Sequence, residues 1–181
     1  MESTTLLDPD DLLRMPGGKD YELIDGRPVE RARGAKLSAI AVRLTGIMHS
    51  YVDAHRLGML FGPRTGYRCF PTRPRTIRKS SLSFVARGRL PNDEAPEGDI
   101  LIPPDLAVES VSPNDTFEEV EVKVKDLLGA GVRLIWIISP TARTVMVRRP
   151  GKNCTALDET DTLTGEDVLP GFTCPVADLF S

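Results

Sequence analysis

Residues 105–111 form an almost continuous apolar run after Asp105, and Glu109 places a carboxylate inside this run. A run of this kind predicts a strand buried on both faces, because a strand with one solvent-exposed face alternates apolar and polar residues. A carboxylate in such surroundings destabilises the fold unless it is paired, hydrogen-bonded or bound to a metal ion. We therefore expect Glu109 to have a partner nearby.

The segment that follows predicts a helix that carries a lysine back towards this strand. Thr116 and Glu119 have the spacing of a capping box, and Gly131 is suited to end the helix. The apolar stripe of the helix consists of Phe117, Val120, Val124, Leu127 and Leu128. Lys123 lies at the border of this stripe, so its long stem can cross apolar surface and bring the ammonium group to the strand, whereas Lys125 lies on the opposite flank. Two interpretations stay open: a buried structural ion pair, or a site that holds a metal ion and stabilises a charged transition state.

The remaining periodicity predicts one α/β domain with a mixed sheet. Asp8-Pro9 is typical of a helix start, and the short helix ends before Gly17-Gly18. Residues 21–30 predict a hairpin around Asp25-Gly26, and residues 35–56 a long helix with Gly58 as its end signal. Further strands are predicted at residues 59–61, 66–70, 76–78, 82–85, 132–138 and 144–148, and residues 161–180 predict short strands, turns and a last helical turn at 176–180.

The length and the cysteine content limit the class of protein to which the chain can belong. The chain has 181 residues, which fits a single domain with a core large enough to fold without disulfides. Its three cysteines, Cys69, Cys154 and Cys174, are far apart and form no C-x-x-C pair, so we expect reduced thiols in a cytoplasmic protein. No basic and apolar leader opens the chain, and the apolar run at residues 134–138 is too short to span a bilayer, so no membrane partner is expected.

The charge is distributed unevenly. Residues 54–92 contain nine basic residues and no acidic one, although the net charge of the whole chain is −3. Such a segment could contact a polyanion, because Arg and Lys supply most of the non-specific affinity for nucleic acid. The candidate nucleic-acid-binding residues are Arg73, Arg75, Arg78 and Lys79. The alternative is that these side chains serve solubility or pair with acidic residues elsewhere in the fold.

Five passages together point to one family. They are Tyr-Glu-Leu-Ile-Asp-Gly-Arg-Pro-Val-Glu at residues 21–30, Pro-Asp-Leu-Ala-Val-Glu-Ser-Val-Ser-Pro-Asn-Asp at 104–115, Lys123, Gly-Val-Arg-Leu-Ile-Trp-Ile-Ile-Ser-Pro at 131–140, and Val-Leu-Pro-Gly-Phe at 168–172. In these passages the chain resembles the Uma-two family of putative restriction endonucleases. The resemblance runs in order over residues 20–181, with residues 1–19 as an N-terminal helix and lead-in.

The resemblance implies a restriction-endonuclease-like core, in which helices flank a central mixed β-sheet, and hydrolysis of phosphodiester bonds in DNA at a PD-(D/E)XK site with Mg²⁺ or Mn²⁺. It implies that Glu109 is the acidic metal ligand, that Lys123 is the catalytic lysine, and that Glu22 is an accessory acidic residue. The chain departs from the family pattern where an aspartate is expected, because Ser81 occupies that position. A serine hydroxyl removes one charge and one strong ligand from the metal site. Asp105 is a weak alternative ligand, four residues before Glu109.

Three hypotheses follow. The first is a metal-dependent DNA endonuclease of the PD-(D/E)XK type that tolerates Ser81 through another carboxylate such as Glu22 or Asp105, with activity that Ser81 weakens. The second is a relative that has lost its activity through Ser81 and binds DNA. The third is a structural or dimerisation protein in which Glu109 and Lys123 are simply paired. A homodimer is expected only by analogy with this class of fold.

Overall fold

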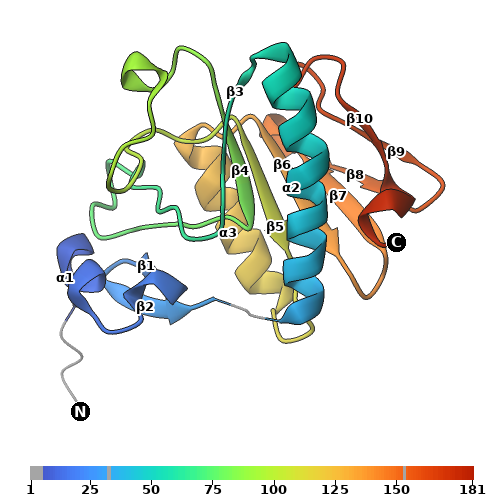
Figure 1. Ribbon diagram of the computed structural model, residues 1–181. Helices are drawn as coiled ribbons and strands as arrows, with labels where there is room; N and C mark the ends of the chain where they lie inside the picture. The colour runs from blue at the N-terminus through green and yellow to red at the C-terminus, as the bar shows by residue number, and fades with distance from the viewer. Residues whose placement is uncertain (1–5, 32–33, 153) are drawn as a thin grey trace.

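A six-stranded mixed sheet forms the centre of the protein (Figure 1). The computed structural model describes residues 6–31, 34–152 and 154–181, so the first five residues of the expected lead-in lie outside it. In spatial order the sheet consists of β3 (Gly58–Phe61), β4 (Leu82–Ala86), β5 (Leu106–Ser110), β6 (Leu134–Ser139), β7 (Thr144–Arg148) and β8 (Cys154–Leu157). Only β5 and β6 run parallel among these neighbours. The mixed α/β fold predicted from the sequence is confirmed.

The parallel pair follows from helix α3 (Phe117–Ala130), which carries the chain from the end of β5 back to the start of β6. The predicted capping box is present, because Thr116 N–H donates to Glu119 Oε2 at 2.9 Å and Glu119 N–H donates to Thr116 Oγ1 at 3.2 Å. Gly131 ends the helix with a φ of 107°, a conformation that favours glycine. The prediction that Phe117 belongs to the apolar stripe is wrong, because its side chain is exposed and the packing against the sheet begins one turn later, at Val120.

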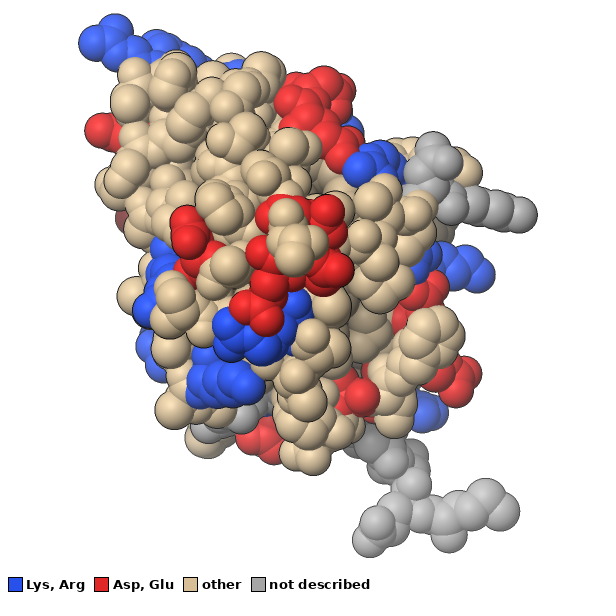
Figure 2. Space-filling model, turned by 90° about the vertical axis from the view of Figure 1, so that its right-hand side faces the viewer, with Lys and Arg blue, Asp and Glu red and all other residues tan. Residues whose placement is uncertain are grey.

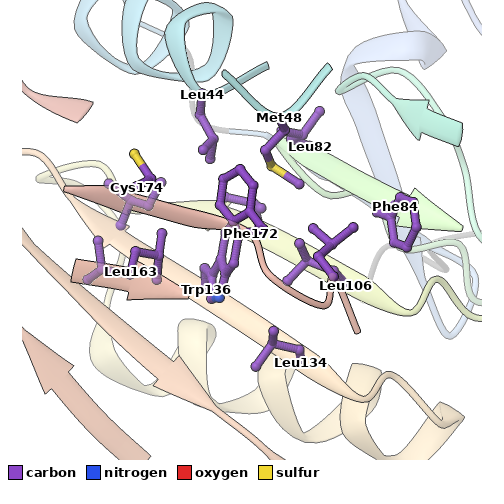
Figure 3. Packing of buried hydrophobic residues seen from close by; sticks show 14 of the residues in the cluster. Leu44, Met48, Leu82, Phe84, Leu106, Leu134, Trp136, Leu163, Phe172 and Cys174 are labelled. Atoms are coloured by element: carbon purple, nitrogen blue, oxygen red, sulfur yellow. The ribbon is translucent and has the colours of Figure 1, made fainter. Parts of the chain in front are cut away.

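Two layers cover the sheet. Helix α2 (Ala35–His55) packs Ile40, Leu44, Met48 and Val52 on one face, and α3 packs Val124 and Leu127 on the other. The C-terminal strands β9 (Thr162–Thr164) and β10 (Thr173–Pro175) and the short helix η4 (Val176–Leu179) join the α2 layer. Between these two strands, Phe172 lies beneath α2 and stacks on Trp136 of β6 with 5.8 Å between the ring centroids (Figure 3). Burying a side chain of this size contributes about 2–3 kcal/mol.

The N-terminal hairpin is a separate two-stranded sheet. Helix α1 (Pro9–Arg14) and the turn η1 (Gly18–Asp20) precede β1 (Tyr21–Ile24) and β2 (Arg27–Glu30). Asp25 and Gly26 join the two strands with positive φ angles of 49° and 82°, as the primed turn requires. Leu23 fixes the hairpin to the rest of the chain, because it exchanges two backbone hydrogen bonds with Ile77, of 3.0 and 2.7 Å.

Several predicted elements differ from the observed ones. Residues 66–70 and 76–78 form isolated bridges instead of strands, because the nearby prolines Pro71 and Pro74 lack the N–H groups that would extend a ladder. The end of α2 is set by Arg56, with a φ of 51°, and Gly58 lies in β3. Strand β8 was not predicted, and neither were the single turns η2 (Pro91–Asp93) and η3 (Pro150–Lys152).

The three cysteines are unpaired, as expected. Across the described ranges, not even the 21-residue α2 combines the length and the apolar content that a membrane crossing needs.

Candidate active site

Glu109 lies near the end of β5 on the face that α3 covers. Its neighbour on this face, Ala107, packs against Val124 and Leu127, and the Glu109 residue is itself only 7% exposed. Its Oε2 atom lies 2.8 Å from Lys123 Nζ. Its Oε1 atom is buried and has no hydrogen-bond partner among the described residues. One oxygen of a buried carboxylate is therefore unsatisfied, which is costly in a site with no further occupant.

Lys123 reaches from α3 to three acceptors. Its Nζ atom lies 2.8 Å from Glu109 Oε2 and 2.8 Å from Glu22 Oε1, and it donates to the backbone oxygen of Lys79 at 2.6 Å. Lys123 therefore makes ion pairs with two carboxylates and one hydrogen bond with a backbone oxygen. The expected approach of Lys123 to the buried strand is therefore present, and its catalytic role stays a prediction.

Glu22 enters the site from β1 of the hairpin. Its Oε1 atom accepts a 2.7 Å hydrogen bond from Lys79 N–H in addition to the contact with Lys123, and its Oε2 atom accepts one of 3.0 Å from Arg78. Burial alone raises the pKa of Glu22, but the positive charges of Lys123 and Arg78 outweigh this effect and lower the pKa to about 2. Both carboxylate oxygens are thus engaged, and Glu22 stays ionised.

A chain of alternating charges connects the site to the hairpin turn. Arg78 Nε donates to Asp126 Oδ2 at 2.9 Å, and the other oxygen of Asp126 accepts a 2.5 Å hydrogen bond from Arg73. Arg73 also donates to Asp25 Oδ1 at 2.8 Å, in the turn between β1 and β2. Sequence reasoning missed Asp126. Its signal was the position three residues after Lys123 on α3, which places both side chains on one face of the helix.

Ser81 directly precedes β4 and lies next to Glu109, where this segment pairs with β5. Its N–H donates to the backbone oxygen of Val108 at 2.8 Å, and its hydroxyl accepts a 3.1 Å hydrogen bond from Ser110 N–H. The partners in these two hydrogen bonds, Val108 and Ser110, are the residues on either side of Glu109. The position at which the family resemblance expects an aspartate is therefore next to the buried glutamate, and a neutral hydroxyl occupies it.

Asp105 lies at the other end of β5 and is held by groups that do not reach the site. Its Oδ2 atom accepts hydrogen bonds from Arg89 at 2.7 Å and from Ala86 N–H at 2.8 Å, and its Oδ1 atom is 3.6 Å from Arg133. These contacts fix the start of the strand. The structure does not bring Asp105 together with Glu109.

The four candidate nucleic-acid-binding residues lie in two environments. Arg78 and Lys79 are buried, at 3% and 5% exposure, and the Lys79 ammonium group donates to the backbone oxygen of Lys19 at 3.1 Å. Arg73 is partly exposed and Arg75 is exposed, and Arg75 pairs with Asp8 at 2.7 Å. On the side of the molecule seen in Figure 2, Lys and Arg lie beside Asp and Glu instead of forming one continuous basic surface.

The oxygen atoms of this site are of the type that a divalent cation such as Mg²⁺ prefers. Within residues 6–31, 34–152 and 154–181, no three or more His, Cys, Asp or Glu side chains are arranged to hold a metal ion. Glu109 Oε1 is buried and has no hydrogen-bond partner in the described part of the chain, and the Ser81 hydroxyl lies next to the strand at Ser110, the residue after Glu109. Mg²⁺ is bound by one or two carboxylates together with water and substrate phosphate, so these groups offer the minimum set. Glu22 could join them only by giving up contacts that it already makes.

The comparisons with known proteins concern the family and the fold. The model of the Uma2 family, described as putative restriction endonuclease, matches residues 9–177. A solved structure, described as a putative nuclease belonging to DUF820 from Anabaena variabilis ATCC 29413, superposes with a TM-score of 0.79 at 23% sequence identity, covering 94% of this chain and 96% of that one. At this identity the likeness shows a shared fold. No curated protein matches the chain.

Proposed function

The chain belongs to the Uma2 family of putative restriction endonucleases, and we propose that it is a divalent-metal-dependent DNA endonuclease of the PD-(D/E)XK type whose activity is weakened by Ser81. The family and the structural neighbour support a nuclease. The observation that carries the proposal is the buried Glu109 carboxylate, which has one oxygen bound to Lys123 and the other free. A carboxylate that served only as half of a structural ion pair would be expected to have both oxygens satisfied.

Each residue of the site has a chemical role in this proposal. Glu109 Oε1, with Ser81 beside it, would hold Mg²⁺ or Mn²⁺, which lowers the pKa of a bound water and offsets negative charge on the phosphate. Lys123 fixes the orientation of Glu109 through the 2.8 Å contact and supplies positive charge next to the reacting phosphate. Glu22 holds Lys123 from the opposite side, also at 2.8 Å. Removing Lys123 would leave two buried carboxylates without the cation that lies between them.

The alternative is a relative that binds DNA or forms dimers without cleaving DNA. Its support is that the two carboxylates Glu22 and Glu109 are balanced by two cations, Lys123 and Arg78, within the fold. DNA affinity measured against salt concentration separates the two branches of this alternative, because phosphate contacts give a steep loss of affinity with salt. A homodimer remains a prediction that sedimentation analysis can test.

The decisive experiment is plasmid cleavage. We expect slow relaxation and linearisation of supercoiled plasmid with Mn²⁺ or Mg²⁺, and loss of this activity with EDTA or in Glu109→Gln. Arg149→Gln is the matched control, because Arg149 pairs with Glu166 at 2.8 Å outside the site. Cleavage that survives EDTA, or that Glu109→Gln leaves intact, would contradict the proposal. Absence of cleavage by the unaltered protein and by Ser81→Asp would favour the inactive alternative.

A further inference from the structure

Arg78 is a buried arginine that bridges two carboxylates from different elements. It donates to Glu22 Oε2 at 3.0 Å, on the hairpin, and through Nε to Asp126 Oδ2 at 2.9 Å, on α3. Its backbone is fixed as well, because Arg78 and Tyr67 exchange hydrogen bonds of 2.8 and 3.2 Å. With 3% of its surface exposed, Arg78 is closed to a DNA phosphate in this arrangement.

The contacts of Arg78 close a ring of charges. Glu22 contacts Lys123 on α3, Asp126 lies one helical turn further along α3, and Arg78 connects Asp126 back to Glu22. Each of the two anions, Glu22 and Asp126, therefore touches two cations. Because one turn of α3 supplies both Lys123 and Asp126, any shift of the hairpin against α3 strains the ring at two points.

Glu22 depends on this ring for its orientation. The hairpin is not part of the central sheet, and its backbone is tied to the segment before Arg78 through Leu23 and Ile77. Arg78 holds Oε2 of Glu22, so the other oxygen faces Lys123 and Lys79 N–H. Without the guanidinium, the carboxylate could rotate about its terminal torsion, and Lys123 would lose one of its three fixed acceptors.

We propose that Arg78 is a positioning residue of the active site, which holds Glu22 and, through Glu22, sets the Lys123 ammonium against Glu109. This inference rests on the proposed function for its catalytic consequence, and on the geometry of the ring for its structural one. It separates Arg78 from the exposed arginines of the same basic segment, such as Arg75, which pairs with Asp8 at the surface.

The chemistry of the side chain explains why an arginine is needed. A guanidinium presents donors in a planar fork and can serve two carboxylates from fixed directions, whereas an ammonium group is a single point charge on a flexible stem. Arg78→Lys therefore keeps the charge and loses one side of the bridge. We expect it to recover only part of what Arg78→Gln loses.

Cleavage kinetics test the catalytic consequence. In Arg78→Gln we expect kcat to fall by about 10–100-fold, the range typical of residues that orient metal-site ligands, while KM, DNA affinity and its salt dependence stay within about twofold. Arg78→Lys should lie between Arg78→Gln and the unaltered protein, and Arg149→Gln should leave kcat unchanged. A loss of DNA affinity with a shallower salt dependence at unchanged kcat would make Arg78 a DNA contact and overturn the inference.

Amide exchange tests the structural consequence without any need for cleavage. Lys79 N–H donates to Glu22 Oε1 at 2.7 Å, so a freed Glu22 should speed its exchange by at least about tenfold relative to central-sheet amides such as Ile137. Unchanged exchange would overturn the inference. If Arg78→Gln does not fold, Asp126→Asn loosens the same bridge from the other side and should show the same selective change. Absence of cleavage in all variants, Ser81→Asp included, with this exchange response intact would refute the proposed function alone.

Discussion

Restoring a carboxylate at position 81 should raise the affinity of the site for divalent cations. Ser81 is partly exposed and lies beside the buried Glu109, so Ser81→Asp places a second negative charge near the free Oε1 atom. Two unit charges about 4 Å apart attract by about 1 kcal/mol in water, and a divalent ion therefore gains about 2 kcal/mol from one added carboxylate. At 1.4 kcal/mol per tenfold change, this corresponds to about 30-fold tighter binding. The same arithmetic gives a loss of about 1 kcal/mol in stability without metal, through repulsion from Glu109.

Isothermal titration calorimetry with Mn²⁺ measures the gain, and urea unfolding without and with Mn²⁺ measures the linked change in stability. The double variant Ser81→Asp with Glu109→Ala is the control, because the gain depends on both groups acting on one ion. Equal Mn²⁺ affinity of Ser81→Asp and the unaltered protein would refute the placement of the site. A gain that persists in the double variant would show that the ion binds elsewhere.

Three further predictions concern stability. Lys123→Met leaves Glu22 and Glu109 buried with too little positive charge, and we expect the free energy of unfolding, measured in urea, to fall by about 3–5 kcal/mol. The double variant with Glu109→Gln should regain a part of this loss. A loss below about 1 kcal/mol would mean that the pair is not buried as described. The pKa of Glu22 is lowered from 4.5 to about 2 in the folded protein, so Glu22 is protonated first in the unfolded chain as the pH falls. The ionised Glu22 therefore stabilises the folded state by up to about 3 kcal/mol above pH 4.5, and this contribution is lost as the pH falls towards 2. Urea unfolding at a series of pH values should show a shallower loss in Glu22→Gln, and identical pH profiles would contradict this assignment. Thr116→Ala removes the capping box of α3 and should lower the free energy of unfolding by about 1 kcal/mol, whereas Phe117→Ser, at an exposed position, should change it by less than about 0.5 kcal/mol in thermal unfolding.

Much of the fold could be predicted from local sequence. The Asp25-Gly26 turn, the capping box at Thr116 and the buried run around Glu109 each have a short-range physical cause, and each was found where it was expected. The approach of Lys123 to β5 could also be predicted, because a helical wheel and a long aliphatic stem suffice to place the ammonium group. These features need no knowledge of distant partners.

The parts that could not be predicted depend on distant partners. Arg78 was interpreted as a candidate for nucleic-acid contact, because its neighbours in sequence are basic, but its partners Glu22 and Asp126 are 56 and 48 residues away. The strands expected at residues 66–70 and 76–78 have suitable composition, but the segments that face them decide how far a ladder extends, and only isolated bridges at Tyr67, Ile77 and Arg78 form. Net charge along a segment does not reveal which of its arginines are neutralised inside the fold.

The order of elements in the chain has a consequence for folding kinetics. The unit of β5, α3 and β6 is contiguous, so Glu109 and Lys123 need to close only a short loop before they meet. The hairpin must close a far longer loop, since 56 residues separate Glu22 from Arg78. Because contacts between distant residues form more slowly than local ones, we expect the hairpin to dock late in refolding. The substitution Glu22→Gln should then change the unfolding rate more than the refolding rate, as measured by stopped-flow kinetics. This result would mean that the contacts of Glu22 form after the transition state.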